Sequence, residues 1–492
     1  MFVHTIKVLR PLLLFAAVLS AGPGPNAGEV LQSFVTYRAF IASRPGLAPA
    51  QKSELEHLDQ LASAAEKAGD YRNALRHITH GMAMLQGMEW TPATSLSLSL
   101  QVTLDHIMWE PGKTVHVTVS EKFPHEGEFT EKLPVQAFLK SQEPGELYAP
   151  IKKWEPIDLQ KLPWTGEFQV PAIKNENFYT FELKLPTTAP VMLQREVTIR
   201  LQGGVEGRAD AIRQRAEKLN AEAKTDTAFL TVLYAANLYH LVDSSSVDSK
   251  YVNFRKEFDS ANRMLDALEQ GNDPVRQGHG DMHLAYRSKL DGTLQPYRLF
   301  IPSAYDGKKD VPLVVVLHGM GGDENTIFEA YRSTALQQLA EHFCYLIVCP
   351  KGRETTSMYR GAAEQDVMDV LGEVRRQFRV DGKRIYLMGH SMGGYGTWSI
   401  AMNHPDVFAA LAPVSGGGDP AGLEKIRSIP EFVVHGSADT IVPVKNSQIM
   451  VEAARKLGIE VQYKEIAGGD HSGALLPTVG EIFAWFQTHS RN

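Results

Sequence analysis

A serine stands between two closely spaced glycines at Gly389–Gly393, which has the form G-x-S-x-G with Ser391 at its centre. The apolar stretch Arg384–Met388 before it is typical of a strand, and Gly394–Ala401 after it is typical of a buried helix. A strand that turns sharply into a helix holds the serine hydroxyl exposed, in a strained backbone conformation. The pattern predicts that Ser391 is a nucleophile, and the alternative is a glycine-rich turn with an incidental serine.

A nucleophilic serine needs a base, and two later loops supply a candidate base and acid. Asp439 follows the apolar run Phe432–Val434, and His471 follows Val461–Glu465. Loops that leave parallel strands gather at one edge of a sheet. We expect His471 to take the proton of Ser391 and return it to the leaving group, while Asp439 holds the imidazole in one tautomer. The chain order of serine, acid and histidine is the one that follows such a serine turn in many hydrolases.

Three other side chains compete for these roles. Asp470 is adjacent to His471, but neighbouring side chains usually diverge, so we expect Asp439 to be the acid. Asp419 follows the preceding strand and is a weaker alternative. His435 opens the loop that carries Asp439, and we expect it to shape that loop rather than to react.

A second glycine-rich turn, His318–Gly322, follows the most apolar run of the chain. Glycines let a backbone turn its N–H groups toward a substrate carbonyl. We therefore expect an oxyanion hole formed by the backbone N–H of Met392 and by that of Met320 or its neighbour Gly319. The alternative is an ordinary tight turn.

The elements that must position these groups alternate between strand and helix from about residue 278 to the C-terminus. The predicted strands are Thr293–Ile301, Val311–Leu317, Tyr345–Val348, Ile385–Met388, Phe408–Val414, Phe432–Val434 and Val461–Tyr463. The predicted helices are Glu364–Phe378, Ser391–Asn403, Val444–Leu457 and Leu476–His489. This alternation predicts an α/β catalytic domain at residues 278–492 with a doubly wound, mostly parallel sheet.

Residues 291–489 resemble secreted α/β-hydrolase esterases of the prolyl-oligopeptidase-like and polyhydroxybutyrate-depolymerase-like group. The resemblance is carried by Asp291–Tyr297, Leu317–Gly322, Gly389–Trp398, Val434–Asp439 and Gly469–His471. It implies an α/β-hydrolase fold and hydrolysis of ester, or less often peptide, bonds through an acyl-enzyme without a cofactor. It covers under half of the chain. Prolyl oligopeptidases carry a β-propeller in front of the hydrolase domain, and the absence of a blade repeat here makes a peptidase the second choice.

The N-terminal part has a different organisation. Residues 1–22 are predicted to be a signal peptide, because two basic residues precede a short apolar run and then small residues. An uncleaved membrane anchor is the alternative. Residues 30–90 and 205–272 have helical periodicity, which predicts a helical segment and a helical linker.

Residues 95–203 contain short alternating runs separated by turns, beginning with Leu96–Leu104. This spacing predicts a small, immunoglobulin-like β-sandwich that serves as an accessory domain. A sugar-binding platform of Trp109, Trp154 and Trp164 is one interpretation of its tryptophans, but we expect burial in a core or interface.

The composition argues against several classes of partner and site. The 50 basic and 57 acidic residues give a net charge of −7 without long blocks, so nothing favours nucleic acid or an anionic membrane. Cys344 and Cys349 lie at the two ends of one predicted strand, too far apart for a disulfide. We expect two buried thiols and no metal site.

Together these features predict an exported, secreted or periplasmic serine carboxylesterase for short acyl groups. Acetyl or feruloyl esters of polysaccharide are candidate substrates, and no membrane contact is expected after signal removal. Homo-oligomerisation through the N-terminal domains stays open. A prolyl-oligopeptidase-like peptidase is the alternative enzyme. A non-catalytic binding protein on a hydrolase scaffold is the alternative of another class, and the intact set Ser391, Asp439 and His471 argues against it.

Overall fold

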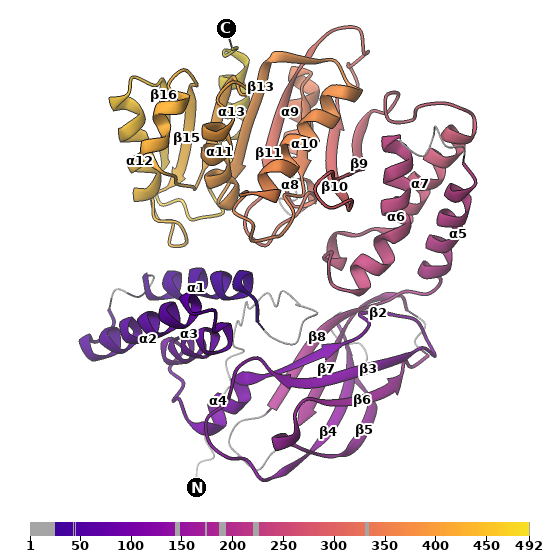
Figure 1. The fold of residues 1–492 in the computed structure, drawn as a ribbon, viewed down its shortest axis with the longest axis vertical. Helices are drawn as coiled ribbons and strands as arrows, with labels where there is room; N and C mark the ends of the chain where they lie inside the picture. The colour runs from indigo at the N-terminus through magenta and orange to yellow at the C-terminus, as the bar shows by residue number, and fades with distance from the viewer. Residues whose placement is uncertain are drawn as a thin grey trace.

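The chain runs from N-terminal helices through a pair of β-sheets and a helical segment to a C-terminal α/β part (Figure 1). The computed structural model describes residues 25–491 apart from 43, 45, 143–147, 173–174, 186–192, 220–225 and 330–333. The predicted signal peptide, residues 1–22, lies outside the described residues. Among the helices that are described, none has the length and apolar character needed to cross a membrane.

The C-terminal part is built on an 8-stranded sheet with the strand order β16-β15-β14-β13-β11-β12-β10-β9. Its strands are β9 (Gly280–Arg287), β10 (Leu294–Ile301), β11 (Val311–Leu317), β12 (Leu346–Pro350), β13 (Val380–His390), β14 (Ala410–Val414), β15 (Glu431–Gly436) and β16 (Val461–Ile466). β10 is antiparallel to both of its neighbours, and the other pairs are parallel. The predicted α/β class with a doubly wound, mostly parallel α/β-hydrolase sheet is confirmed. The edge strand β9 was not predicted, because its sequence mixes polar and apolar residues without a clear period.

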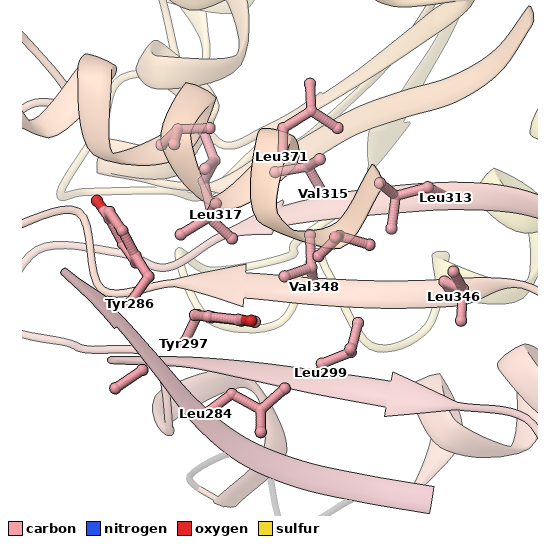
Figure 2. Packing of buried hydrophobic residues seen from close by; sticks show 14 of the residues in the cluster. Leu284, Tyr286, Tyr297, Leu299, Leu313, Val315, Leu317, Leu346, Val348 and Leu371 are labelled. Carbon is pink, nitrogen blue, oxygen red and sulfur yellow. The ribbon is translucent and has the colours of Figure 1, made fainter. Parts of the chain in front are cut away.

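The central strand β11 is buried along its whole length, as its continuous apolar sequence predicts. Leu313, Val315 and Leu317 point into one core, and Val314 and Val316 point into a second core on the opposite face. Figure 2 shows the first core, where Leu313, Val315 and Leu317 pack against residues of β9, β10 and β12. Because β11 is packed on both faces, the loop that leaves its carboxyl end starts from a fixed position.

Helices cover both faces of the sheet. α10 (Ala362–Gln377), α11 (Met392–Asn403) and α12 (Lys445–Lys456) contribute to the first core. α9 (Ala335–Phe343) and α13 (Val479–Gln487) contribute to the second. A short helix, α8 (Thr326–Glu329), follows β11. The elements that carry Ser391, Asp439 and His471 are thus anchored in packed cores.

The segment predicted as a helical linker is part of the first core. It forms α5 (Val205–Glu217), α6 (Thr227–Asp243) and α7 (Phe254–Glu269). Buried residues of α6 share a cluster with Leu284 of β9, and the N–H of Ala285 donates to Thr231 Oγ1 at 2.9 Å. The helices therefore pack on the β9–β10 end of the sheet. The interpretation as a linker was wrong in this respect, because the apolar face of α6 has its partner in strands far along the chain.

Residues 100–201 form two sheets around a common core. One sheet contains β1 (Leu100–Leu104), β3 (Thr114–Glu121) and β6 (Trp164–Gln169). The other contains β2 (Met108–Trp109), β8 (Leu193–Leu201), β7 (Asn177–Leu185), β4 (Lys132–Ser141) and β5 (Tyr148–Asp158). Trp109 is fully buried in this core, and Trp154 and Trp164 pack edge to face at its border. Trp109 is thus buried in the core, whereas Trp154 and Trp164 are only partly buried at its border.

The first half of the predicted strand Leu96–Leu104 is helical, which corrects the sequence interpretation. Helix α4 (Pro92–Ser99) begins with a proline, and the Thr91 side chain accepts a hydrogen bond from the N–H of Thr94. Both features favour a helix start. Both the polar and the apolar residues of the alternating run are buried in this helix. The alternation therefore does not mark a strand with one buried and one exposed face.

The helices α1 (Ala27–Ala42), α2 (Pro49–Lys67) and α3 (Tyr71–Leu85) have their own small core. In Figure 1 α1 lies on the side of this group that is turned toward the α/β part. A Cβ built on Gly28 of α1 would come within 2.9 Å of Thr356 Oγ1, so the helix approaches the loop after β12 closely. The N-terminal helices therefore reach the α/β part at a loop that also contacts the candidate site described below.

The two cysteines are free, as predicted, but only Cys349 is buried. Cys344 is half-buried and ends α9 in the left-handed conformation, with φ 53°. The expectation of two buried thiols was wrong for Cys344, because it lies before β12 rather than in it.

Glu431, at the start of β15, is fully buried. The indole N–H of Trp398 donates to its Oε2 at 3.1 Å, and its Oε1 has no hydrogen-bond partner among the described residues. Burial disfavours the carboxylate and outweighs the hydrogen bond from Trp398, so the pKa of Glu431 is raised to about 7.

The raised pKa of Glu431 makes the stability of the fold depend on pH. An unfolded glutamate loses its proton near about pH 4.3, whereas folded Glu431 keeps it to about pH 7, so stability falls across this interval by about 4 kcal/mol. Glu431→Gln cannot ionise, and we expect it to be more stable than the wild type above pH 7. Denaturant unfolding of both proteins on either side of this interval measures the effect. A variant that is less stable than the wild type by the same amount at both pH values would contradict it.

Candidate active site

Ser391 occupies a strained turn between β13 and α11. Its backbone has φ 58° and ψ −118°, a conformation that L-residues rarely adopt. The N–H of Ser391 donates to the carbonyl of Val414 at 2.9 Å. A Cβ on Gly389 would lie 2.5 Å from the carbonyl oxygen of Gly393, and a Cβ on Gly393 would lie 2.3 Å from that of Leu317. The two glycines of the motif are therefore required by close backbone contacts, as the sequence suggested.

Asp439 and His471 form a chain of hydrogen bonds that ends at Ser391. His471 Nδ1 lies 2.7 Å from Asp439 Oδ2, and His471 Nε2 lies 2.8 Å from Ser391 Oγ. An ionised carboxylate only accepts, so Nδ1 carries a proton and Nε2 of the neutral ring is free to accept from the hydroxyl. Asp439 is buried, whereas the side chain of His471 is 16% exposed. Three residues from distant parts of the chain thus meet in the geometry of a nucleophile, a base and an orienting acid.

Several donors keep the Asp439 carboxyl ionised. The backbone N–H groups of Ile441 and Val442 donate to Oδ1 at 2.9 and 2.8 Å. Burial alone would raise the pKa of Asp439, but hydrogen bonds from His435, His471 and the Val442 N–H outweigh it and hold the pKa well below its usual range. The acid is therefore an anion across the pH range in which an imidazole can act as a base.

The loops that carry the acid and the histidine are joined by their backbones. The N–H of Ala438 donates to the carbonyl of Gly469 at 2.9 Å, and the N–H of Gly468 donates to Ser437 Oγ at 2.8 Å. A Cβ on Gly436 would lie 2.3 Å from the Gly469 carbonyl oxygen. This close approach fixes the separation between Asp439 and His471.

The turn predicted to form the oxyanion hole lies beside the serine. A Cβ on Gly319 would be 3.5 Å from the Cβ of Ser391. The carbonyl oxygen of Gly319, in the same peptide group as the Met320 N–H, accepts from His318 Nδ1 at 2.8 Å and from the Gly322 N–H at 3.1 Å. Met392 is the first residue of α11, where helical N–H groups have no partner within the helix. Met392 and either Met320 or Gly319 therefore remain the predicted donors.

The loop after β12 supports this turn from behind. The carbonyl of Thr355 accepts from the N–H of Gly321 at 2.8 Å, and the hydroxyl of buried Tyr359 donates to the carbonyl of His318 at 3.3 Å. Met358 and Tyr359 both have positive φ, at 50° and 51°. The strained loop thus holds the turn against the elbow, which is the strand-to-helix turn Gly389–Gly393 that carries Ser391.

The alternative acids have other partners. Asp470 Oδ1 accepts from the N–H of Gly473 at 2.7 Å and stabilises a turn. Asp419 caps a short 3-10 helix (Pro420–Ile426) by accepting from the N–H of Ala421 at 3.0 Å. These contacts favour Asp439 as the acid.

His390, inside the elbow motif, has a contact that the sequence analysis did not anticipate. Its Nε2 donates to the backbone carbonyl of His471 at 2.7 Å, and the two rings pack with centroids 4.8 Å apart. Burial lowers the pKa of His390 to about 4, so the ring is neutral. The sequence showed only that His390 is adjacent to Ser391. This adjacency gives no information about a contact with His471, which lies 81 residues later.

Two protein-family models match the C-terminal part. The model described as PET hydrolase-like matches residues 360–483, and the model described as esterase PHB depolymerase matches residues 295–421. The bifunctional acetylxylan esterase/xylanase XynS20E of Neocallimastix patriciarum is 31% identical over 134 residues, which are 27% of this chain and 20% of the relative. Cutinase 1 of Thermobifida cellulosilytica is 33% identical over 102 residues, which are 20% of this chain and 37% of the relative.

A solved structure of a thermostable esterase is 19% identical, with a TM-score of 0.40, over 79% of this chain and 99% of its own. The chain spans 20% and 37% of the length of the two curated relatives. The family matches confirm that the C-terminal part resembles α/β-hydrolase esterases of the polyhydroxybutyrate-depolymerase-like group.

Proposed function

We propose that this protein is a serine carboxylesterase that hydrolyses esters of short acyl groups through an acyl-enzyme on Ser391. The observation that carries the proposal is the unbroken chain of hydrogen bonds from Asp439 through His471 to Ser391 at the end of a strained elbow. The similarity of the C-terminal part to esterases and cutinases supports ester substrates. The likeness to an acetylxylan esterase supports acetyl esters of polysaccharide as substrate candidates, and feruloyl esters are a second candidate class.

The proposed reaction has two halves that use the same groups. His471 Nε2 takes the hydroxyl proton as Ser391 Oγ attacks the ester carbonyl, and Asp439 stabilises the imidazolium that forms. The N–H groups of Met392 and Met320, or Gly319, would hold the oxyanion of the tetrahedral intermediate. His471 then gives its proton to the departing alcohol. A water molecule, activated in turn by His471, releases the acyl group and restores Ser391.

The short segment between β14 and β15 favours short acyl groups over the long chains of lipase substrates. It contains one short 3-10 helix, Pro420–Ile426, and no longer insertion that would close over the site. Export remains part of the proposal, because residues 1–22 have the order of a signal peptide.

A series of p-nitrophenyl esters and a proline-containing p-nitroanilide tests this function. We expect kcat/KM for the acetate to exceed that for the octanoate by about tenfold or more, since a site that prefers short acyl groups would exclude the longer chain sterically. We also expect the ester to be turned over faster than the proline amide. Faster turnover of the amide would favour a peptidase, and no turnover of any compound would favour a binding protein.

A further inference from the structure

A second histidine shares the oxygen of Asp439 that bonds to His471. His435 Nε2 lies 3.2 Å from Asp439 Oδ2, and His471 Nδ1 lies 2.7 Å from the same atom. The side chains of His435 and Asp439 are both fully buried. No water reaches this carboxylate oxygen to compensate a change in its partners, so each donor affects the other.

The partners of His435 determine which of its nitrogens carries a proton. Nε2 lies 2.9 Å from the carbonyl oxygen of Val442 as well as 3.2 Å from Asp439 Oδ2, and both of these groups only accept. Nε2 is therefore protonated. Its N–H donates to the Val442 carbonyl and lies close to Asp439 Oδ2 as well. At the other end of the ring, Nδ1 lies 2.7 Å from Ser447 Oγ, which in turn lies 3.1 Å from the carbonyl oxygen of Gly416. The ring is fixed at both ends and cannot turn away from Asp439.

We propose, on the basis of the proposed function, that His435 is a positioning residue that withdraws negative charge from Asp439 and so lets His471 act as a base at lower pH. A polar N–H 3.2 Å from Oδ2 offsets part of the charge with which Asp439 stabilises the imidazolium of His471. The acid-side limb of the activity profile is then expected at lower pH than it would be without His435. His435 contacts no reacting atom and acts only through Asp439.

Three of the other titratable groups that face this pair, His390, Tyr395 and Glu465, hold one charge state near neutral pH. His390, on the elbow, is neutral because burial lowers its pKa to about 4. Burial raises the pKa of Tyr395, on α11, whose hydroxyl accepts from Asn446 at 2.8 Å. Hydrogen bonds from Tyr463 and Gln448 lower the pKa of Glu465 on β16. Asp470, next to His471, is bound to the N–H of Gly473. A shift in the pH profile that follows a change at position 435 therefore reports on the acid and the base.

Two amide variants separate the two ends of the His435 ring. His435→Gln places an amide N–H near the position of Nε2 and keeps a donor for Asp439. His435→Asn is shorter, so its amide can replace Nδ1 toward Ser447 but cannot reach Asp439. We expect the acid-side midpoint of the kcat/KM profile for p-nitrophenyl acetate to move up by about 0.5–1 pH unit in His435→Asn. We expect it to stay near the wild-type value in His435→Gln.

Two controls test whether the effect passes through Asp439. Ser447→Ala removes the partner of Nδ1 and leaves the contact with Asp439, so we expect lower stability and an unmoved midpoint. In an Asp439→Asn background the carboxylate is absent, so adding His435→Asn should move the midpoint no further. If His435→Asn does not fold, His435→Leu, which also lacks the donor, takes its place in the same comparison.

An unmoved midpoint in the variant that lacks the donor, or an equal shift in Ser447→Ala, would overturn the role of His435. Loss of turnover in Ser391→Ala together with an unmoved midpoint would overturn this role alone. Full turnover in Ser391→Ala would instead overturn the proposed function.

Discussion

Replacing Ser391 with alanine is expected to lower kcat for p-nitrophenyl acetate by a factor on the order of 10⁵–10⁶. The reason is that His471 Nε2, 2.8 Å from Ser391 Oγ, loses the hydroxyl it would activate, and no acyl-enzyme can form. The remaining rate would come from binding and from the oxyanion donors alone. Steady-state kinetics, with a burst experiment on the wild type to detect the acyl-enzyme, measures the effect.

Ser399→Ala on the same helix is the matched control for this substitution. The Ser399 hydroxyl donates to the carbonyl of Gly396 at 3.3 Å and contacts none of the proposed catalytic groups. We expect near wild-type activity from it. If Ser391→Ala retained the activity of Ser399→Ala, Ser391 would not be the nucleophile, and the proposal of a serine esterase would fail.

Gly393→Ala is expected to abolish activity by preventing the elbow from closing, although it adds only a methyl group. That methyl group would lie 2.3 Å from the carbonyl oxygen and 2.8 Å from the carbonyl carbon of Leu317, and these are backbone atoms of the buried strand β11. To relieve the contact, α11 must move away from β11, which would displace Ser391 from His471. We expect a large loss of thermal stability, or failure to fold, together with loss of esterase turnover.

The matched control for this change is Gly372→Ala in α10. A Cβ there meets nothing within 4 Å, and the residue is exposed on a helix. We expect it to stabilise the protein by about 0.5–1 kcal/mol, because alanine favours a helix over glycine. Thermal unfolding of both variants measures the contrast. A Gly393→Ala protein as stable and active as Gly372→Ala would show that the elbow tolerates the extra atom.

The elbow and the order of Ser391, Asp439 and His471 could be predicted from sequence because they depend on local rules. The glycines around Ser391 report a close approach of strand and helix, and the positions of Asp439 and His471 after apolar runs place them on loops. The apolar run of β11 likewise predicted a strand buried on both faces. Local patterns carry this information because each reflects the backbone geometry of a few consecutive residues.

Other features depend on partners far along the chain, and the sequence did not indicate them. The strand β9 is held by its pairing with β10 and by α6, rather than by a strong pattern of its own. The run at Leu96 alternates like a strand, but its first part is helical because Thr91 and Pro92 favour a helix start and its neighbours bury both sides. Burial by remote residues overrides local preference in each case.

By itself, the sequence determined the fold class of the C-terminal part and the residues proposed to react. It did so because alternating strands and helices, and a glycine-bounded serine, are local signals. Only the tertiary structure decided that α6 packs on the β9–β10 end of the sheet and that one oxygen of Asp439 lies close to both His471 and His435. Those contacts join segments that are far apart in the chain. Their closeness in space is set by how the folded cores pack, and the separation in sequence does not predict it.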